Sequence, residues 1–411
     1  MSKEENKDGP ALTGLSIETA LYRLTERIRP IDETVTVPLD KAMGAVNAEA
    51  IHAPEAVPSF RRAAMDGYAV RVSDIAGASE EKPAQLKVAD ELCAGDFRVF
   101  PYASGSAVRI MTGAAVPDVF DAVVKQEDTD QGDKMVSVFT PAEEGMNICP
   151  LGEEFSKGAL AIPARSRIGR IGLGILASFG MTELTVIRSP RVAVLSTGSE
   201  LVAPGDIMLP GHIYGSISFM LRASIQGEGF EVSYDRIVGD DKELMKKELK
   251  AALECSDLVL TTGGVSVGKK DLMHDVLDEI GAQKLFYLAD IQPGTPTIGS
   301  ICGGKVILSL SGNPYAALAN FDYYFFPLVA RLMGCDAYLK KTKEAILADP
   351  YEKVNRSRRL VRAYEENGQV FLRAAGHKSS MFGNLTNCNC YMDVPAGVRL
   401  SLGDRVTIRC M

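Results

Sequence analysis

The chain is poor in cysteine and histidine. It has eight cysteines in 411 residues, too few for a disulfide scaffold, and only Cys388 and Cys390 lie close together in sequence. Its four histidines are scattered, at His52, His212, His274 and His377. Neither residue type has the spacing of a zinc site, so we expect no structural zinc.

The chain also lacks an excess of positive charge and a long apolar run. Its 53 acidic residues outnumber its 45 lysines and arginines, which gives a net charge of −8 and a pI of about 5.3. Such a charge repels nucleic acids and acidic membranes, so we expect neither as a partner. No stretch approaches the roughly 20 apolar residues of a spanning helix, and the charged opening segment does not resemble a signal peptide. We therefore expect a cytoplasmic protein.

What the sequence does contain is apolar material for several folded units. Hydrophobic residues make up 46% and charged residues 24%, the ordinary balance of a globular protein. At about 150 residues per domain, a chain of this length predicts roughly three domains.

Two separated stretches predict helices. Apolar residues recur at helical spacing from Ile17 to Ile28, Ser16 can cap the start and Pro30 ends the run. A second helix is expected from Arg167 to Phe179. We expect the two helices to pack side by side, in one domain built from both stretches.

The region between these helices predicts a β-rich insertion, because short runs of β-forming residues alternate with Gly, Pro and Asp clusters. The expected strands are Ala69–Val72, Gln85–Val88, Ala107–Met111, Asp121–Lys125 and Met135–Phe139. Between Arg191 and Gly334, near-continuous apolar strands alternate with helices, which predicts a parallel sheet covered on both faces. In the last segment, Asn367-Gly368 between two alternating runs predicts a hairpin.

The expected fold class is therefore α/β. A parallel three-layer α/β core domain is accompanied by a discontinuous helical N-terminal domain, a β-rich insertion domain and a C-terminal small β-barrel domain. The expected boundaries are 11–57 together with 148–188, then 58–147, 189–335 and 336–411.

Three strands of the α/β core run into loops of small residues, at 195–200, 260–268 and 310–314. In a doubly wound sheet such loops gather at the carboxyl ends of the strands, where backbone N–H groups and helix N-termini can hold phosphate. One loop alone is better explained as a turn. Three in one sheet favour a phosphorylated ligand.

Acidic residues accompany these loops, and each has a structural alternative. Glu200 follows Thr197 at capping-box spacing, but Pro204 leaves room for only about one helical turn, so we favour a functional role. Asp271 either caps the following helix or binds a divalent cation. In the β-rich region, Asp66-Gly67 is explained first as a hairpin turn.

Seven segments occur in a characteristic order: PSFRRAAMDGYAV (58–70), RIMTGAAVPDVFDAVVKQED (109–128), NICPLGEEFSKG (147–158), VAVLSTGSEL (192–201), TTGGVSVGKKD (261–271), QPGTP (292–296) and LSGNPYAA (310–317). Taken together they resemble the molybdopterin molybdenumtransferase family, which comprises the MoeA proteins and the E domain of gephyrin. The likeness runs from about Leu15 to the C-terminus.

The resemblance implies an elongated four-part homodimer, in which the β-rich insertion of one subunit faces the α/β domain of the other. It also implies the reaction. Adenylylated molybdopterin and molybdate are combined, the metal enters the dithiolene, and AMP is released with help from Mg²⁺. The adenylyltransferase of the same pathway, or a molybdoenzyme that receives the product, would be a further partner.

By motif position the resemblance also assigns site residues. The catalytic residues would be Asp66, Thr112, Glu200 and Asp271, and the Mg²⁺ ligands Asp240 and Asp271. The residues that bind the pterin nucleotide would be Glu154, Thr197, Gly198, Ser199, Gly263, Gly264, Ser266, Gly268, Pro293, Gly294, Ser311, Gly312, Asn313, Pro314 and Ser380.

The chain departs from the family pattern at several basic positions. Cys149 replaces the arginine of N-I-R-P, and Gln292 and Thr295 replace the lysines of K-P-G-K-P. A charge-assisted hydrogen bond contributes about 1.5 to 3 kcal/mol, so two lost donors would weaken molybdate binding by a few powers of ten. Lys269, Lys270, Arg170 and Arg373 are the candidates to compensate.

Three functions remain open from the sequence. The first is an active molybdenum-insertion transferase. The second is a catalytically altered paralogue that acts as a molybdopterin-binding carrier or interaction module in molybdoenzyme maturation. The third is another nucleotide-dependent transferase.

Overall fold

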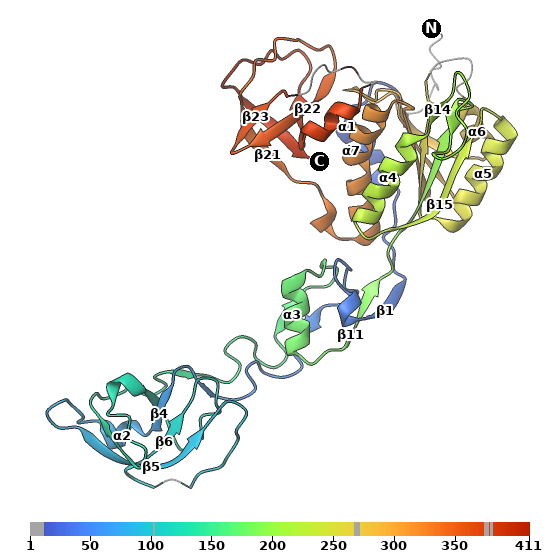
Figure 1. The fold of residues 1–411 in the computed structure, drawn as a ribbon. Coiled ribbons are helices and arrows are strands. Elements are labelled where there is room, and N and C mark those ends of the chain that lie inside the picture. Colours follow the sequence, from blue (N-terminus) through green and yellow to red (C-terminus); the bar gives the residue numbers. More distant parts are fainter. Residues whose placement is uncertain (1–11, 102, 267–271, 374–377, 379–380) are drawn as a thin grey trace.

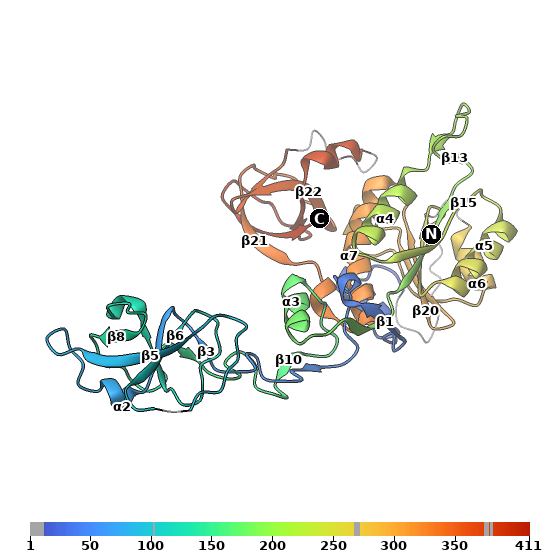
Figure 2. The ribbon, with the colours of Figure 1, turned by 60° about the horizontal axis from the view of Figure 1, so that its bottom comes forward.

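The computed structural model describes residues 12–101, 103–266, 272–373, 378 and 381–411. The molecule is elongated: a β-rich part lies at one end, a linking part in the middle, and an α/β part with a small barrel beside it at the other end (Figure 1). Figure 2 shows the same separation after a rotation. The expected four-part α/β architecture is confirmed.

The α/β part is built on a six-stranded sheet of order β15-β12-β16-β20-β19-β17. Its strands are β12 (Arg191–Thr197), β15 (Glu231–Val238), β16 (Leu258–Thr262), β17 (Gln283–Tyr287), β19 (Ile298–Cys302) and β20 (Lys305–Leu310). Neighbours among β15, β12, β16 and β20 pair in parallel, whereas β19 is antiparallel to both of its neighbours, β20 and β17. The fully parallel sheet that we expected is therefore wrong at this edge, because the two-residue turn at Gly303-Gly304 can join only antiparallel strands.

Helices cover both faces of this sheet. α5 (Lys242–Cys255) and α6 (Met273–Glu279) pack on one face, and α4 (Ser216–Gly227) and α7 (Pro314–Met333) on the other. The three layers that we expected are thus present. No helix in the described part of the chain has the length and apolar character needed to cross a membrane.

The first helix, α1 (Ile17–Thr25), belongs to the α/β part. Its cap is as expected, since the Ser16 hydroxyl accepts a hydrogen bond from the Thr19 N–H (3.2 Å). Its buried stripe joins the core that contains α7, while α3 (Arg170–Ser178) packs in the linking part. The expected pairing of the two helices is therefore wrong. Helical spacing identifies the buried residues of α1, but it does not identify the element against which they pack. That element is α7, which has a large apolar surface.

The linking part is made from both sides of the β-rich insertion. β1 (Thr34–Pro38) pairs antiparallel with β11 (Glu183–Ile187), and β2 (Ile51–His52) with β10 (Leu160–Ile162). α3 and the short 3-10 helix η1 (Leu39–Lys41) cover these pairs. Two stretches that are distant in sequence therefore fold together.

The β-rich part has a five-stranded sheet of order β7-β4-β6-β5-β8. Its elements are β3 (Arg62–Ala63), β4 (Gly67–Val70), α2 (Val72–Ile75), β5 (Ala84–Leu92), β6 (Ser106–Ile110), β7 (Ala122–Lys125), η2 (Gln126–Asp128), β8 (Met135–Val138) and β9 (Ile148–Cys149). Asp66-Gly67 is not a hairpin turn, because β3 pairs with β9 and not with β4. A Cβ at Gly67 would lie 1.9 Å from the Val124 carbonyl oxygen, so this glycine serves the close approach of two strands.

The C-terminal part is a closed five-stranded barrel. Its elements are η3 (Asp336–Tyr338), β21 (Thr342–Leu347), β22 (Arg358–Glu366), β23 (Gln369–Phe371), η4 (Gly383–Asn387), β24 (Cys390–Val394) and β25 (Arg405–Cys410). The strand order is β22-β23-β21-β25-β24, and β24 pairs back with β22. The expected hairpin is confirmed: Asn367 and Gly368 have φ of 52° and 79° between β22 and β23. β18 (Ile291–Gln292) of the α/β part adds in parallel to β22.

A buried carboxyl group lies where the barrel meets α7. The Tyr391 hydroxyl of β24 donates a hydrogen bond to Asp322 Oδ2 of α7 (2.8 Å). Only 7% of Asp322 is exposed. Loss of water raises the pKa of this carboxyl group to about 6, although the hydrogen bond from Tyr391 opposes the shift.

Asp322→Asn should remove a pH dependence of the free energy of unfolding. Because the folded state binds this proton more tightly than the unfolded chain, its stabilisation is present below about pH 4 and is lost as the pH rises through about 6. At pH 7 the buried charge costs on the order of 2 to 3 kcal/mol. The variant keeps an acceptor for Tyr391, so it should unfold at higher denaturant than the natural chain at pH 7 but not near pH 4. A difference that is equal at both pH values would contradict this.

Candidate functional site

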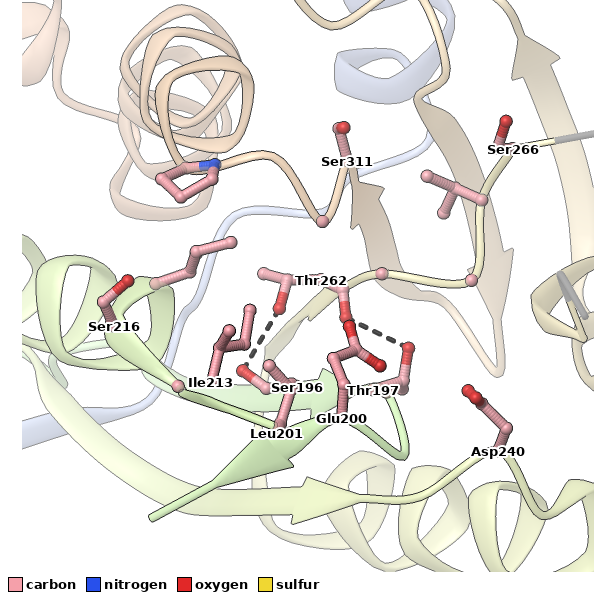
Figure 3. Close-up of a pocket in the computed structure, with 18 of the residues that line it drawn as sticks. Ser196, Thr197, Glu200, Leu201, Ile213, Ser216, Asp240, Thr262, Ser266 and Ser311 are labelled. Carbon is pink, nitrogen blue, oxygen red and sulfur yellow. Dashed lines mark hydrogen bonds between the residues drawn. The ribbon is translucent and has the colours of Figure 1, made fainter. Parts of the chain in front are cut away.

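The carboxyl ends of β12, β16 and β20 open into one cavity of about 420 Å³ (Figure 3). This is within the range of cavities that hold small ligands. The three loops of small residues that we singled out from the sequence all line it. Ten predicted site residues are among the lining: Thr197, Gly198, Glu200, Asp240, Gly263, Gly264, Ser266, Ser311, Gly312 and Pro314.

The loops after β12 and β16 are in close contact at the base of the cavity. The Thr197 hydroxyl donates to the Thr262 carbonyl oxygen (3.1 Å), and the Thr262 hydroxyl donates to Ser196 Oγ (3.1 Å), as Figure 3 shows. Gly263 has φ +91°, and a Cβ there would lie 2.3 Å from the Thr197 carbonyl oxygen. Only glycine fits this position, and the fit brings the two loops to the same ligand.

Two helices begin at the cavity. α4 begins at Ser216 and α7 at Pro314, and no side chain caps either N-terminus. By contrast, α5 is capped by the Asp241 carboxylate, which accepts from the Leu244 N–H (2.8 Å). The uncapped first turns of α4 and α7 leave N–H groups and positive dipole ends for an anionic ligand.

Sequence reasoning missed one wall of this cavity. The wall consists of Ile213, Tyr214, Gly215, Ser216 and Ile217, from β14 (Ile213–Tyr214) and the start of α4. The one available signal in the sequence was Gly215, directly before the segment that forms α4. β14 pairs with β13 (Leu201–Val202), a small ribbon that no hydrophobic pattern predicted.

The charged side chains that line the cavity are both acidic. They are Glu200 and Asp240, and among the described residues no lysine, arginine or histidine joins them in the lining. The capping role of Glu200 is excluded, because strand β13 and not a helix follows it. Asp240 is tied to the β12 loop: its N–H donates to Ser199 Oγ (2.8 Å), and the Ser199 N–H donates to its Oδ2 (3.3 Å).

These carboxylates fit Mg²⁺ in one particular mode. In the described part of the chain no three His, Cys, Asp or Glu side chains gather to hold a metal ion. Mg²⁺ in nucleotide sites is commonly bound by one or two carboxylates, with phosphate oxygens and water completing the shell. Glu200 and Asp240 suit that arrangement, in which the ion arrives with a phosphorylated ligand.

Some predicted site residues are not among those that the structure describes. Gly268, Asp271 and Ser380 fall outside the described residues, as do Lys269 and Lys270. The choice between a capping and a metal-binding role for Asp271 therefore stays open.

Other predicted residues lie behind the cavity. Asn313 is the N-cap position of α7. Pro293 and Gly294 form a loop that Asn320 of α7 holds from within the core, through Nδ2 bonds to the Gly294 carbonyl oxygen (2.8 Å) and to Thr297 Oγ1 (2.6 Å). The lining residue of this loop is Pro296.

Three predicted residues lie far from the cavity within one chain. Asp66 and Thr112 are in the β-rich part, and Glu154 follows β9; both ribbon views place that part at the opposite end of the molecule. Asp66 Oδ1 accepts from the Thr112 hydroxyl (2.6 Å) and from its N–H (2.7 Å). These two bonds lower the pKa of Asp66, so its carboxylate is ionised and is held in place by Thr112.

Arginines stand beside two of the neutral replacements. Arg359 of β22 lies beside Gln292, with Nη1 3.4 Å from Gln292 Oε1, and Arg62 is the cross-strand partner of Cys149. Of the compensating residues that we expected, Arg373 pairs with Glu366 (3.3 Å) at the far hairpin of the barrel. Arg359 could not be found from the sequence, because it lies 67 residues from Gln292 along the chain. Only the pairing of β22 with β18 brings the two residues together.

The α/β part that carries this cavity corresponds to a known domain family. Residues 193–331 match the family model "Probable molybdopterin binding domain", and residues 15–180 match "MoeA N-terminal region (domain I and II)". The chain belongs to the MoeA family, which has its role in molybdenum cofactor biosynthesis.

Relatives of known name and solved structures agree over nearly the whole chain. The molybdopterin molybdenumtransferase of Staphylococcus epidermidis is 33% identical over 390 residues, 94% of this chain and 93% of that protein. The one of Staphylococcus aureus strain MRSA252 is 33% identical over 388 residues, 94% and 92% of the two chains. The crystal structure of the molybdopterin biosynthesis MoeA protein from Pyrococcus horikoshii OT3 superposes with a TM-score of 0.85 at 28% identity, covering 97% of this chain and 100% of that one.

Gly263→Ala should damage the cavity more than it damages the fold. Gly304→Ala is the matched control, since Gly304 also has a positive φ (79°) but no atom within 4 Å of the added Cβ. Both variants should lose about 1 to 2 kcal/mol of stability through backbone strain. Only Gly263→Ala, which separates the two loops, should also weaken binding of molybdopterin, by roughly tenfold or more. Calorimetric titration measures the affinity, and equal affinities in the two variants would contradict the role of Gly263.

Proposed function

We propose that this chain is a molybdopterin molybdenumtransferase that combines adenylylated molybdopterin with molybdate and releases AMP. The observation that carries the proposal is the convergence of three strand-end loops and two uncapped helix N-termini beside two carboxylates. Backbone N–H groups and hydroxyls suit the phosphates of a nucleotide. The choice of molybdopterin as the ligand and of molybdenum as the transferred metal rests on the names of the relatives.

In this proposal each group of the cavity has a defined task. The N–H groups of the loops after β12 and β16 hold the phosphoanhydride, and Ser266 and Ser311, which also line the cavity, donate hydrogen bonds to the ligand. Glu200 and Asp240 would hold Mg²⁺, which neutralises phosphate charge when it is bound. Because the lining described above brings no cation of its own, a dianionic ligand needs that neutralisation.

The oxyanion step needs a positive group near the Gln292 loop. Molybdate is a dianion, and Arg359 brings a permanent positive charge to the edge of β18. A guanidinium also presents several N–H donors in a fixed fork, which suits a tetrahedral oxyanion. In our proposal Arg359 therefore replaces the lysines that Gln292 and Thr295 lack.

We further propose that the working form is a homodimer. Asp66 and Thr112 are too distant to reach the cavity of their own chain. In an isologous dimer each β-rich part can reach the α/β part of the other subunit, and both sites are completed at once. Asp66, Thr112 and Glu154 would then act on the ligand that the partner holds.

The direct test is AMP release by the purified protein. With adenylylated molybdopterin and Mg²⁺, AMP should appear in proportion to added molybdate. Glu200→Gln, which keeps the shape and removes the charge, should lower the rate and raise the Mg²⁺ concentration required. If the nucleotide binds but neither molybdate nor tungstate releases AMP, the carrier function replaces the enzyme. Turnover of ATP on an unrelated acceptor would instead indicate another nucleotide-dependent transferase.

The dimer can be tested by complementation between two inactive variants. Asp66→Ala and Glu200→Gln should each abolish most activity, but mixed dimers contain one site with both residues intact. Random co-expression should therefore restore roughly a quarter of the natural activity. Co-expression of the natural chain with the double variant is the control for expression level. No recovery in the mixture would contradict a site shared between subunits.

A further inference from the structure

Two cysteines face each other across neighbouring strands of the barrel. Cys390 of β24 is the cross-strand partner of Cys410 of β25. The Met411 N–H donates to the Asn389 carbonyl oxygen (3.0 Å), so the adjacent residue pair is the hydrogen-bonded one. Cys390 and Cys410 are therefore a non-hydrogen-bonded pair, in which the two Cα atoms are only about 4.5 Å apart. This separation lies at the short end of the range that a disulfide spans.

Both side chains point to the same face of the sheet. Cys390 is fully buried in the barrel core together with Met392. Cys410 lies two residues beyond Ile408 of the same core, and alternate residues of a strand share a face. Cys410 is partly exposed whereas Cys390 is buried, so Cys410 is the cysteine of the pair that a small molecule in solution would meet first.

A lysine accompanies the two thiols at this end of the barrel. Lys343 of β21 forms an ion pair with Glu365 of β22 (2.6 Å), and its ammonium interacts electrostatically with both Cys390 and Cys410. Burial raises the pKa of the Cys390 thiol to about 12, and the Lys343 ammonium partly opposes that rise. The site therefore combines a partly exposed cysteine, a buried cysteine on the facing strand and a lysine.

We propose that Cys390 and Cys410 are a redox-active pair that exchanges with small-molecule disulfides to form a disulfide within the barrel. The Cys410 thiolate attacks one sulfur of the small disulfide, and the other half leaves as a thiolate. The Cys390 thiolate then attacks Sγ of Cys410 in the mixed disulfide and releases the second half. The two cysteines lose two electrons and two protons, which the small disulfide gains as it becomes two thiols.

The cross-link joins the two strands that fasten the barrel to α7. Tyr391, next to Cys390, donates to Asp322, and the guanidinium of Arg409, next to Cys410, lies 4.0 Å from the centre of the Tyr323 ring. The N-terminus of α7 borders the cavity described above. The redox state of the pair thus acts on the attachment of the barrel and not on any group in the cavity.

The experiment is equilibration of the full-length protein with glutathione and glutathione disulfide, followed by acid quenching, alkylation and tryptic mapping. Cleavage after Arg409 separates Cys410 from the peptide that carries Cys388 and Cys390. In oxidising buffer the peptide that begins at Cys410 should be attached to that peptide, and two of the eight thiols should be lost. Mapping the natural chain needs no variant and therefore does not depend on the folding of one.

Variants then assign the bond. Cys388→Ser should still form the cross-link, while Cys390→Ser and Cys410→Ser should not. The proposal is overturned if the folded protein keeps its thiols at every glutathione ratio, if Cys410 carries only glutathione, or if the bond forms through Cys388. None of these outcomes depends on the transferase reaction, so the two proposals stand or fall separately.

Discussion

The parallel pairing of β12, β16 and β20 is the constraint on which the site depends. Its register aligns Ser196 with Thr262, and Thr262 with Leu310, so the three strands end at the same height. Their loops then meet without any long-range signal in the loop sequences themselves. The approach is so close that Gly263 must lack a side chain, and the hydroxyls of Thr197 and Thr262 connect the two loops. Backbone N–H groups are fixed before a ligand arrives, and they lose little entropy when it binds.

The charged groups of the cavity are carboxylates, and they determine which ligands the cavity can hold. A wall of backbone dipoles and hydroxyls can bind phosphate without any cation, but it cannot neutralise the ligand's charge. The chain adds carboxylates at Glu200 and Asp240, which makes binding of an anion alone unfavourable. This charge is the reason for our proposal that the ligand binds together with Mg²⁺. The positive charge at Arg359 lies on barrel strand β22, beside Gln292, and does not line the cavity.

Sequence reasoning was accurate where local pattern decides the structure and incomplete where tertiary contacts decide it. The three loops, the alternation of strands and helices in the core and the Asn367-Gly368 turn follow from spacing and from glycine, and they were found. The helix against which α1 packs was not found, because an amphipathic pattern shows which side chains are buried but not which element covers them. The capping role for Glu200 was open from spacing alone and is excluded only by the β13–β14 ribbon. Arg359 depends on closure of the barrel against β18, which no local pattern encodes.

The junction between the linking part and the α/β part explains why the β-rich part stays apart from its own cavity. Arg188, just after β11, binds Asp257 through two hydrogen bonds (2.8 and 3.1 Å) and also binds Glu33. Burial alone would raise the pKa of Asp257, but its bonds to Arg188 and to the Arg191 N–H outweigh that effect and lower it. The junction is therefore a partly buried, charge-assisted clamp, and swinging the arm back would leave these charges unpaired. In the homodimer that we propose, the elongated chain would carry the Asp66–Thr112 pair to the cavity of the other subunit.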